Sequence, residues 1–191
     1  MRLIFVRHGE TDLNLARKYC GQLDVGLNEH GVQQMELLRE KLDSYSIDLV
    51  ITSDLLRAHQ SAEILTDVKA FGFPAFNEMD FGDFEGYTYQ EISAKFPLDW
   101  DNYCNNWQTA IFPNGESFPI FYDRVIAAFM EEWKKWQQFD TVLFVGHLGV
   151  LRVIALFLQK QKIAFYWDND FKQGTYSLWD NESQRFVILN Q

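Results

Sequence analysis

The stretch Leu3-Ile4-Phe5-Val6-Arg7-His8-Gly9-Glu10-Thr11 decides the fold of this chain. Its first four residues are apolar and rich in strand formers, which is typical of a strand buried on both faces in a parallel sheet. The apolar run stops at an arginine, a histidine and a glycine. Ligands of open α/β sheets bind beyond the carboxyl ends of the strands. We therefore expect Arg7 and His8 to lie in a functional site.

Two further segments, 48–51 and 141–145, repeat the pattern of a buried strand. Between the strands, apolar residues recur at the spacing of an amphipathic helix. These stripes are Val32, Met35, Leu38 and Leu42, and then Leu55, Ala58, Ala62 and Leu65. A long helix is expected over 117–139 with Ser117 as its N-cap, a more buried helix over 150–158, and a hairpin around Asp180-Asn181. This alternation predicts an α/β three-layer sandwich, in which helices flank a mostly parallel central sheet.

The chain is expected to form a single domain over residues 1–191, with a small helical cap inserted at about 86–115. The inserted segment breaks the alternation of strands and helices. It carries aromatic residues separated by polar ones: Tyr87, Tyr89, Phe96, Trp100, Tyr103, Trp107 and Phe112. Two interpretations are open for these rings. They form the core of the cap itself, or some of them line a pocket for a planar group.

The net charge of −10 excludes whole classes of partner. Nucleic acid and anionic membranes bind clustered Lys and Arg, which an acidic surface does not offer. No apolar stretch reaches the roughly 18 residues of a membrane span, and the N-terminal run is too short for a signal peptide. Cys20 and Cys104 show no metal-ligand spacing. A cytoplasmic location with reduced thiols is the expectation.

Three predicted strand ends carry basic side chains. Arg7 and His8 follow the first strand, Arg57 comes soon after the second, and His147 follows the third. Each residue alone has an ordinary structural explanation, but their shared position concentrates positive charge where a phosphate could bind. A neutral imidazole attacks an anionic phosphoryl group without adding charge, and arginine forks match its oxygens. Such chemistry needs neither metal nor cofactor, and the four histidines lack the spacing of metal ligands.

Ordered motifs from Leu3 to Arg152 resemble those of the histidine phosphatase superfamily, which includes cofactor-dependent phosphoglycerate mutases and many small phosphatases. Two positions depart from the family pattern. Leu148 stands where many relatives carry a smaller residue, and Gly26 stands where Pro or Ser is expected. The motifs are Arg7-His8-Gly9-Glu10-Thr11 with Asn14, Gly21-Gln22-Leu23-Asp24 with Leu27, Ser53-Asp54-Leu55-Leu56-Arg57-Ala58 with Ser61-Ala62, the segment 77–86, Pro113-Asn114-Gly115-Glu116-Ser117 with Arg124-Val125, and the segment 145–152.

The resemblance implies a role for each matching residue. His8 becomes the phosphorylated nucleophile, and Glu78 acts as general acid and later as the base that activates water. Arg7, Arg57 and His147 bind the phosphoryl oxygens. Phosphate binding is also implied for Asn14, for Gln22 and for the backbone N–H of Leu148.

Within the family, the short chain and the loop over 77–86 are most similar to alpha-ribazole phosphatases. This implies hydrolysis of alpha-ribazole 5'-phosphate in cobalamin biosynthesis, by a monomer or homodimer that binds a small phosphorylated metabolite. A broad-specificity phosphatase and a phosphoglycerate mutase are alternatives, although Lys95 is the only basic residue of the cap that could hold a second phosphate. A non-catalytic phospho-ligand module is disfavoured because every implied catalytic residue is present, and a metal-dependent hydrolase is disfavoured by the histidine spacing.

Overall fold

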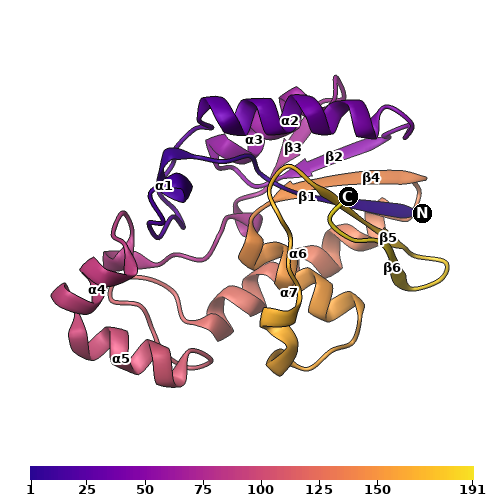
Figure 1. Ribbon diagram of the computed structural model, residues 1–191. Coiled ribbons are helices and arrows are strands. Elements are labelled where there is room, and N and C mark those ends of the chain that lie inside the picture. Colours follow the sequence, from indigo (N-terminus) through magenta and orange to yellow (C-terminus); the bar gives the residue numbers. More distant parts are fainter.

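A six-stranded mixed sheet lies at the centre of the computed structural model, which describes residues 1–191 (Figure 1). The strands follow the order β3-β2-β4-β1-β5-β6. The first four are parallel to one another, whereas β5 and β6 run antiparallel and form the expected hairpin at one side. The strands are β1 (Arg2–Arg7), β2 (Leu49–Thr52), β3 (Ala70–Gly72), β4 (Thr141–Gly146), β5 (Tyr176–Asp180) and β6 (Arg185–Ile188).

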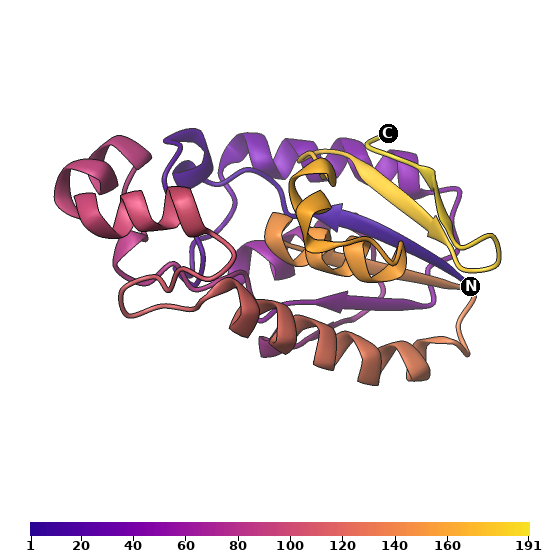
Figure 2. The ribbon, with the colours of Figure 1, turned by 90° about the horizontal axis from the view of Figure 1, so that it is seen from below.

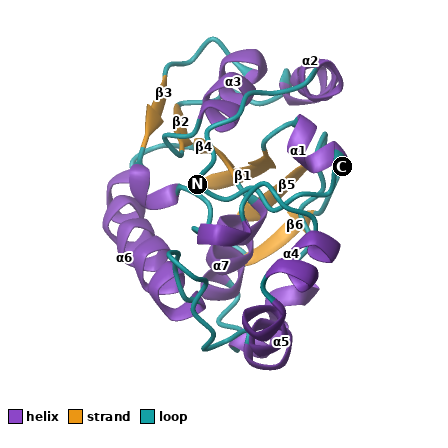
Figure 3. Cartoon of the chain, turned by 90° about the vertical axis from the view of Figure 1, so that its left-hand side faces the viewer, coloured by secondary structure: helices purple, strands orange, loops and turns teal.

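Helices cover both faces of the sheet (Figure 3). On one face, α2 (Glu29–Leu42) and α3 (Leu56–Leu65) pack against Ile4 and Val6 of β1. On the other, α6 (Phe118–Trp136) and α7 (Leu148–Leu158) pack against Leu3 and Phe5. Successive side chains of a strand point to opposite faces, so the continuous apolar run of β1 serves two cores. The three-layer α/β sandwich predicted from the sequence is confirmed.

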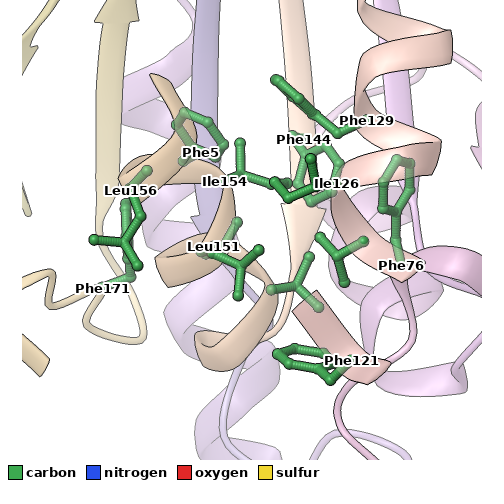
Figure 4. Packing of buried hydrophobic residues seen from close by; sticks show 14 of the residues in the cluster. Phe5, Phe76, Phe121, Ile126, Phe129, Phe144, Leu151, Ile154, Leu156 and Phe171 are labelled. Atoms are coloured by element: carbon green, nitrogen blue, oxygen red, sulfur yellow. The ribbon is translucent and has the colours of Figure 1, made fainter. Parts of the chain in front are cut away.

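The larger core is unusually aromatic. Phe5 and Phe144 lie on neighbouring strands with their ring centroids 6.1 Å apart, and Phe76 packs on Phe144 at 5.0 Å. Figure 4 shows these rings against Leu151 and Ile154 of α7. All five side chains are fully buried. This packing fixes α7 against the sheet, and α7 in turn carries one wall of the site described below.

The long helix α6 begins where the sequence predicts. The hydroxyl of Ser117 accepts a hydrogen bond from the Ile120 N–H, and Pro119 occupies the first turn, where it costs no intrahelical bond. Two short elements were not expected from the sequence, the edge strand β3 and α1 (Asp12–Leu15). Both are too short to show a periodic pattern. Three short 3-10 helices complete the chain: η1 (Pro74–Phe76), η2 (Gly82–Phe84) and η3 (Ile163–Asp168).

The segment expected to form a cap folds as α4 (Tyr89–Lys95) and α5 (Pro97–Asn106), which lie beyond the carboxyl ends of the parallel strands (Figures 1 and 2). Most of its rings pack on one another, as when Phe96 contacts Tyr87 at 6.4 Å between centroids and Tyr103 contacts Phe112 at 4.8 Å. The rings thus mainly form the segment's own core. Tyr103 and Trp107 differ, since they also face a cavity.

No helix combines the length and the apolar character that crossing a membrane requires. Cys20 and Cys104 are free thiols.

Candidate active site

The parallel register of the central strands brings three strand ends together. Arg7 of β1 pairs with Gly146 of β4, and Thr52 of β2 pairs with Val145. The His8 N–H extends the ladder by one bond, to the Gly146 carbonyl oxygen at 2.9 Å. The residues that follow these strands therefore meet at one edge of the sheet, as the sequence predicted.

His8 is buried, with 4% of its surface exposed. Its Nδ1 lies 2.7 Å from the Gly9 carbonyl oxygen, which can only accept, so Nδ1 carries the proton and donates. Burial lowers the pKa of His8 well below its ordinary value, and the charges of Arg57 and Arg7 lower it further. The ring is therefore neutral near pH 7, and its other nitrogen, Nε2, keeps a free lone pair.

His147 is the N-cap residue of α7, and its ring centroid lies 5.2 Å from that of His8. Its Nε2 is 2.7 Å from the hydroxyl of Ser53. The other partner of that hydroxyl is the Leu55 N–H, which can only donate, so Nε2 is the acceptor that the buried hydroxyl proton has within reach. Burial, followed by the charge of Arg57, holds the pKa of His147 well below its ordinary value. The neutral ring then carries its proton on Nδ1, as a donor.

Two arginines complete the positive edge of the site. Arg57 is fully buried, and its terminal nitrogens donate to the Gly21 and Leu23 carbonyl oxygens at 2.7 and 2.8 Å. These bonds fix the guanidinium in place. Burial lowers the pKa of Arg7, an effect that the nearby charge of Glu78 opposes. A guanidinium nevertheless stays charged in proteins.

Three buried nitrogens of this cluster have no hydrogen-bond partner: Arg7 Nε, Arg57 Nε and His147 Nδ1. Buried polar groups in folded proteins are nearly always satisfied, and each exception calls for an explanation. Here all three are donors, and they belong to the three residues expected to hold phosphoryl oxygens. An anion with several acceptor oxygens would satisfy them.

Glu78 reaches the site from the loop between η1 and η2. Its Oε1 accepts from the Met79 N–H at 3.0 Å, and its Oε2 accepts from the Gly149 N–H at 2.9 Å. A Cβ at Gly149 would collide with Oε1, so only glycine there lets the carboxylate approach the start of α7.

Arg124 of α6 holds the Glu78 loop from behind. Its Nε and one terminal nitrogen bind both oxygens of Glu116, at 2.8 and 2.7 Å. Its other terminal nitrogen donates to the Ala75 and Asn77 carbonyl oxygens, each at 3.0 Å. A single side chain thus ties the acidic loop to the long helix.

The remaining predicted binding residues lie around this cluster with partners of their own. Asn14 forms a capping box with Thr11, the N-cap of α1, and its Oδ1 accepts from the Thr11 N–H and from Gln173 Nε2. Gln22 Nε2 donates to the Glu78 carbonyl oxygen at 3.1 Å. The Leu148 side chain lines the cavity next to Glu78. Phosphate binding by these three residues stays a prediction.

The model of the histidine phosphatase superfamily (branch 1) matches residues 3–191. The chain belongs to the histidine phosphatase superfamily. It is 33% identical to the adenosylcobalamin/alpha-ribazole phosphatase of Escherichia coli K12, over 99% of this chain and 94% of that protein. Phosphoserine phosphatase 1 of Hydrogenobacter thermophilus is 30% identical over 99% and 90% of the two chains.

The solved structures agree with the sequences. The crystal structure of a putative alpha-ribazole-5'-P phosphatase from Escherichia coli superposes with a TM-score of 0.94, at 32% identity, over 100% of this chain and 96% of that one. The resemblance found in the motifs is therefore confirmed, as is the expected class of enzyme, a phosphoric monoester hydrolase.

Several residues of this histidine phosphatase site were quoted in the motifs without a role. Ser53 orients His147, Arg124 supports the Glu78 loop, and Gly149 admits its carboxylate. Ser61 accepts from the Gly9 N–H at 3.0 Å and so fixes the turn after His8. Ser53 could have been found from its position at the end of a strand. The contacts of Arg124 and Ser61 depend on tertiary packing that no local pattern reveals.

The neutral state of His8 predicts a pH dependence of stability. Its pKa is lower in the folded than in the unfolded protein, so below about pH 6.5 the unfolded chain binds a proton that the folded chain does not. The free energy of unfolding should therefore fall as pH falls from 7.5 to 5.5. We expect His8→Gln to flatten this fall by up to about 1.4 kcal/mol per pH unit, as measured by urea unfolding at each pH. Equal slopes in the wild type and the variant would mean that the folded ring takes up the proton.

Proposed function

We propose that this chain hydrolyses phosphate monoesters by way of a phosphohistidine on His8. One observation carries the proposal. The free lone pair of a buried neutral imidazole sits in a cluster with three unpartnered donors, from Arg7, Arg57 and His147. The neutral imidazole can attack an anionic phosphoryl group, and the three unpartnered donors can bind its oxygens.

The first step is the transfer of the phosphoryl group to His8. Nε2 attacks phosphorus as the bond to the leaving oxygen breaks, and Arg7, Arg57 and His147 bind the three remaining oxygens. The carboxyl group of Glu78 gives its proton to the leaving oxygen, which departs as an alcohol. The Gly149 N–H then stabilises the carboxylate that this transfer creates.

The second step returns the enzyme to its starting state. Glu78 takes a proton from a water molecule, whose oxygen attacks phosphorus as the bond to Nε2 breaks. Inorganic phosphate leaves, Glu78 is again protonated, and the imidazole is again neutral. The low pKa of His8 favours this step in one respect, because the leaving ring needs no proton of its own.

The substrate that we propose is alpha-ribazole 5'-phosphate, as an intermediate of cobalamin biosynthesis in the cytoplasm. The relatives named as alpha-ribazole phosphatases support it, since they align over nearly the full length of both chains. We place the reaction in one domain over residues 1–191, with 86–115 as its cap. The cap fits a phosphatase better than a mutase. Its single lysine, Lys95, lies over the ring of Tyr87 at 4.0 Å from the centroid. This cation–π contact occupies the only positive charge of the cap that could bind a second phosphate.

A panel of phosphate esters tests the proposed reaction. Purified protein should release phosphate from alpha-ribazole 5'-phosphate at least about tenfold more efficiently than from 3-phosphoglycerate, phosphoserine or adenosine 5'-monophosphate, a difference of roughly 1.4 kcal/mol in transition-state binding. Interconversion of 2- and 3-phosphoglycerate is followed in parallel. Slow phosphate release from every ester would indicate a broad-specificity phosphatase instead of one specific for alpha-ribazole 5'-phosphate. Interconversion of the two phosphoglycerates would indicate a mutase. His8→Ala is the matched control, and turnover by this variant would remove His8 as the nucleophile.

The acid role of Glu78 is tested by the leaving group. Glu78→Gln keeps the shape of the side chain but has no proton to transfer, so it should slow esters of poor leaving alcohols by about 10²- to 10⁴-fold. Hydrolysis of p-nitrophenyl phosphate should slow far less, because p-nitrophenolate leaves without protonation. The measurement is kcat/KM for a series of esters ordered by the acidity of the alcohol. Equal losses across the series would contradict the assignment.

A further inference from the structure

A cavity of about 200 Å³ opens directly beside Glu78. It lies between the end of α5, the start of α7 and the short helix η3. Apart from Glu78, Gly149 and Arg152, the side chains that line it are aromatic or aliphatic. Because Glu78 is the proposed proton donor to the leaving oxygen, the group attached to that oxygen has this cavity next to it.

The aromatic wall is built from two segments that are far apart in sequence. Trp107 at the end of α5 stacks on Tyr166 of η3, with 5.5 Å between ring centroids and 29° between planes. Trp167 meets Trp107 edge to face at 5.3 Å and leaves 49% of its surface exposed. A half-exposed tryptophan at the mouth of an apolar cavity offers a flat face to a planar ligand.

Arg152 of α7 is the only basic side chain that lines the cavity. Its guanidinium carbon lies 5.4 Å from the ring centroid of Tyr166 and 5.1 Å from that of Trp167. Its Nε donates to the Asn169 carbonyl oxygen at 2.8 Å, and the guanidinium also forms a hydrogen bond with the Tyr166 hydroxyl. None of its remaining N–H groups is paired with a carboxylate or a backbone carbonyl. The aromatic rings and the Nε bond thus hold in place a cation that still has donors for a ligand oxygen.

We propose that this cavity is the leaving-group subsite, that Trp107 and Trp167 hold a flat aromatic ring there, and that Arg152 determines specificity by donating to an oxygen of the same leaving group. The chemical class is an aromatic base joined to a hydroxyl-bearing sugar. The volume is below the roughly 300–1,000 Å³ of pockets for drug-sized ligands, so it accommodates a single ring system and leaves any larger part outside. This proposal rests on the proposed phosphatase function and adds the residues that select its substrate.

A small anionic leaving group fits these walls less well. The leaving groups of phosphoglycerate and phosphoserine carry a carboxylate, which Arg152 could bind, but they have no ring to place against Trp107 and Trp167. The aromatic lining therefore favours a neutral ring.

The kinetic test compares Arg152→Met with Arg152→Lys, and uses Arg185→Met as a control because Arg185 is an exposed arginine on β6. Arg152→Met should lower kcat/KM for alpha-ribazole 5'-phosphate by about 10- to 100-fold, mainly through KM, as expected when a charged hydrogen bond to substrate is lost. Hydrolysis of acetyl phosphate should change less than about threefold, and Arg152→Lys should recover part of the loss. Equal losses for both substrates would reduce Arg152 to a structural role, and a loss confined to phosphoserine and phosphoglycerate would make it a carboxylate receptor.

A binding measurement with a ligand that lacks the phosphate tests the subsite separately from catalysis. Calorimetric titration with dephosphorylated alpha-ribazole should show binding that Arg152→Met and Trp167→Ala each weaken at least about fivefold, roughly the value of one aromatic contact or hydrogen bond. Phe71→Ala, at an exposed ring on β3, should leave the affinity unchanged. Binding without turnover of any phosphate would refute the phosphatase proposal and keep the subsite. Turnover of alpha-ribazole 5'-phosphate with affinities unaffected by both cavity variants would refute the subsite and keep the phosphatase.

Discussion

The parallel pairing of β1 with β4, and of β4 with β2, is the constraint on which the site depends. One register places Arg7 opposite Gly146 and Thr52 opposite Val145. A shift of one residue would turn every side chain of β1 to the other face, and would separate His8 from His147. The two hydrophobic cores fix this register, because Leu3 and Phe5 pack against the helices on one face and Ile4 and Val6 pack against those on the other. The packing that fixes the strand register therefore also fixes the positions of the His8 and His147 rings.

Burial determines the protonation state of the His8 and His147 rings. In a protein with a net charge of −10, an anionic substrate is attracted only where positive groups are gathered and shielded from the acidic surface. The same burial and the same arginines hold the pKa of His8 and His147 low. Their neutral rings therefore serve as a nucleophile and a donor, while the fixed charge comes from the guanidinium groups. Hydrogen bonds to Gly9 and Ser53 select the tautomer of each ring.

The sequence predicted the layers and the strand ends, because β1, β2 and β4 are uninterrupted apolar runs and α2, α3 and α6 have clear stripes or caps. It predicted the meeting of His8, Arg57 and His147 because parallel strands end at one edge. It missed β3, which is three residues long. It left open whether cap rings line a pocket, and it missed the second half of that wall, where Tyr166 stacks on Trp107 across 59 positions of sequence. Pairings of that range follow from how α5 and η3 fold back toward α7, which no local pattern encodes.

The most direct test of the account is to trap the covalent intermediate. The enzyme is mixed with substrate for milliseconds and quenched in alkaline detergent, and its peptides are analysed by mass spectrometry. Glu78→Gln is treated in the same way with p-nitrophenyl phosphate, whose leaving group needs no proton, so that the intermediate forms but its hydrolysis is slowed. A single phosphoryl group on the peptide that contains His8, stable in alkali and lost in acid, is the predicted result. Rapid turnover with no phosphorylated His8, or with the phosphoryl group on another residue, would contradict the account.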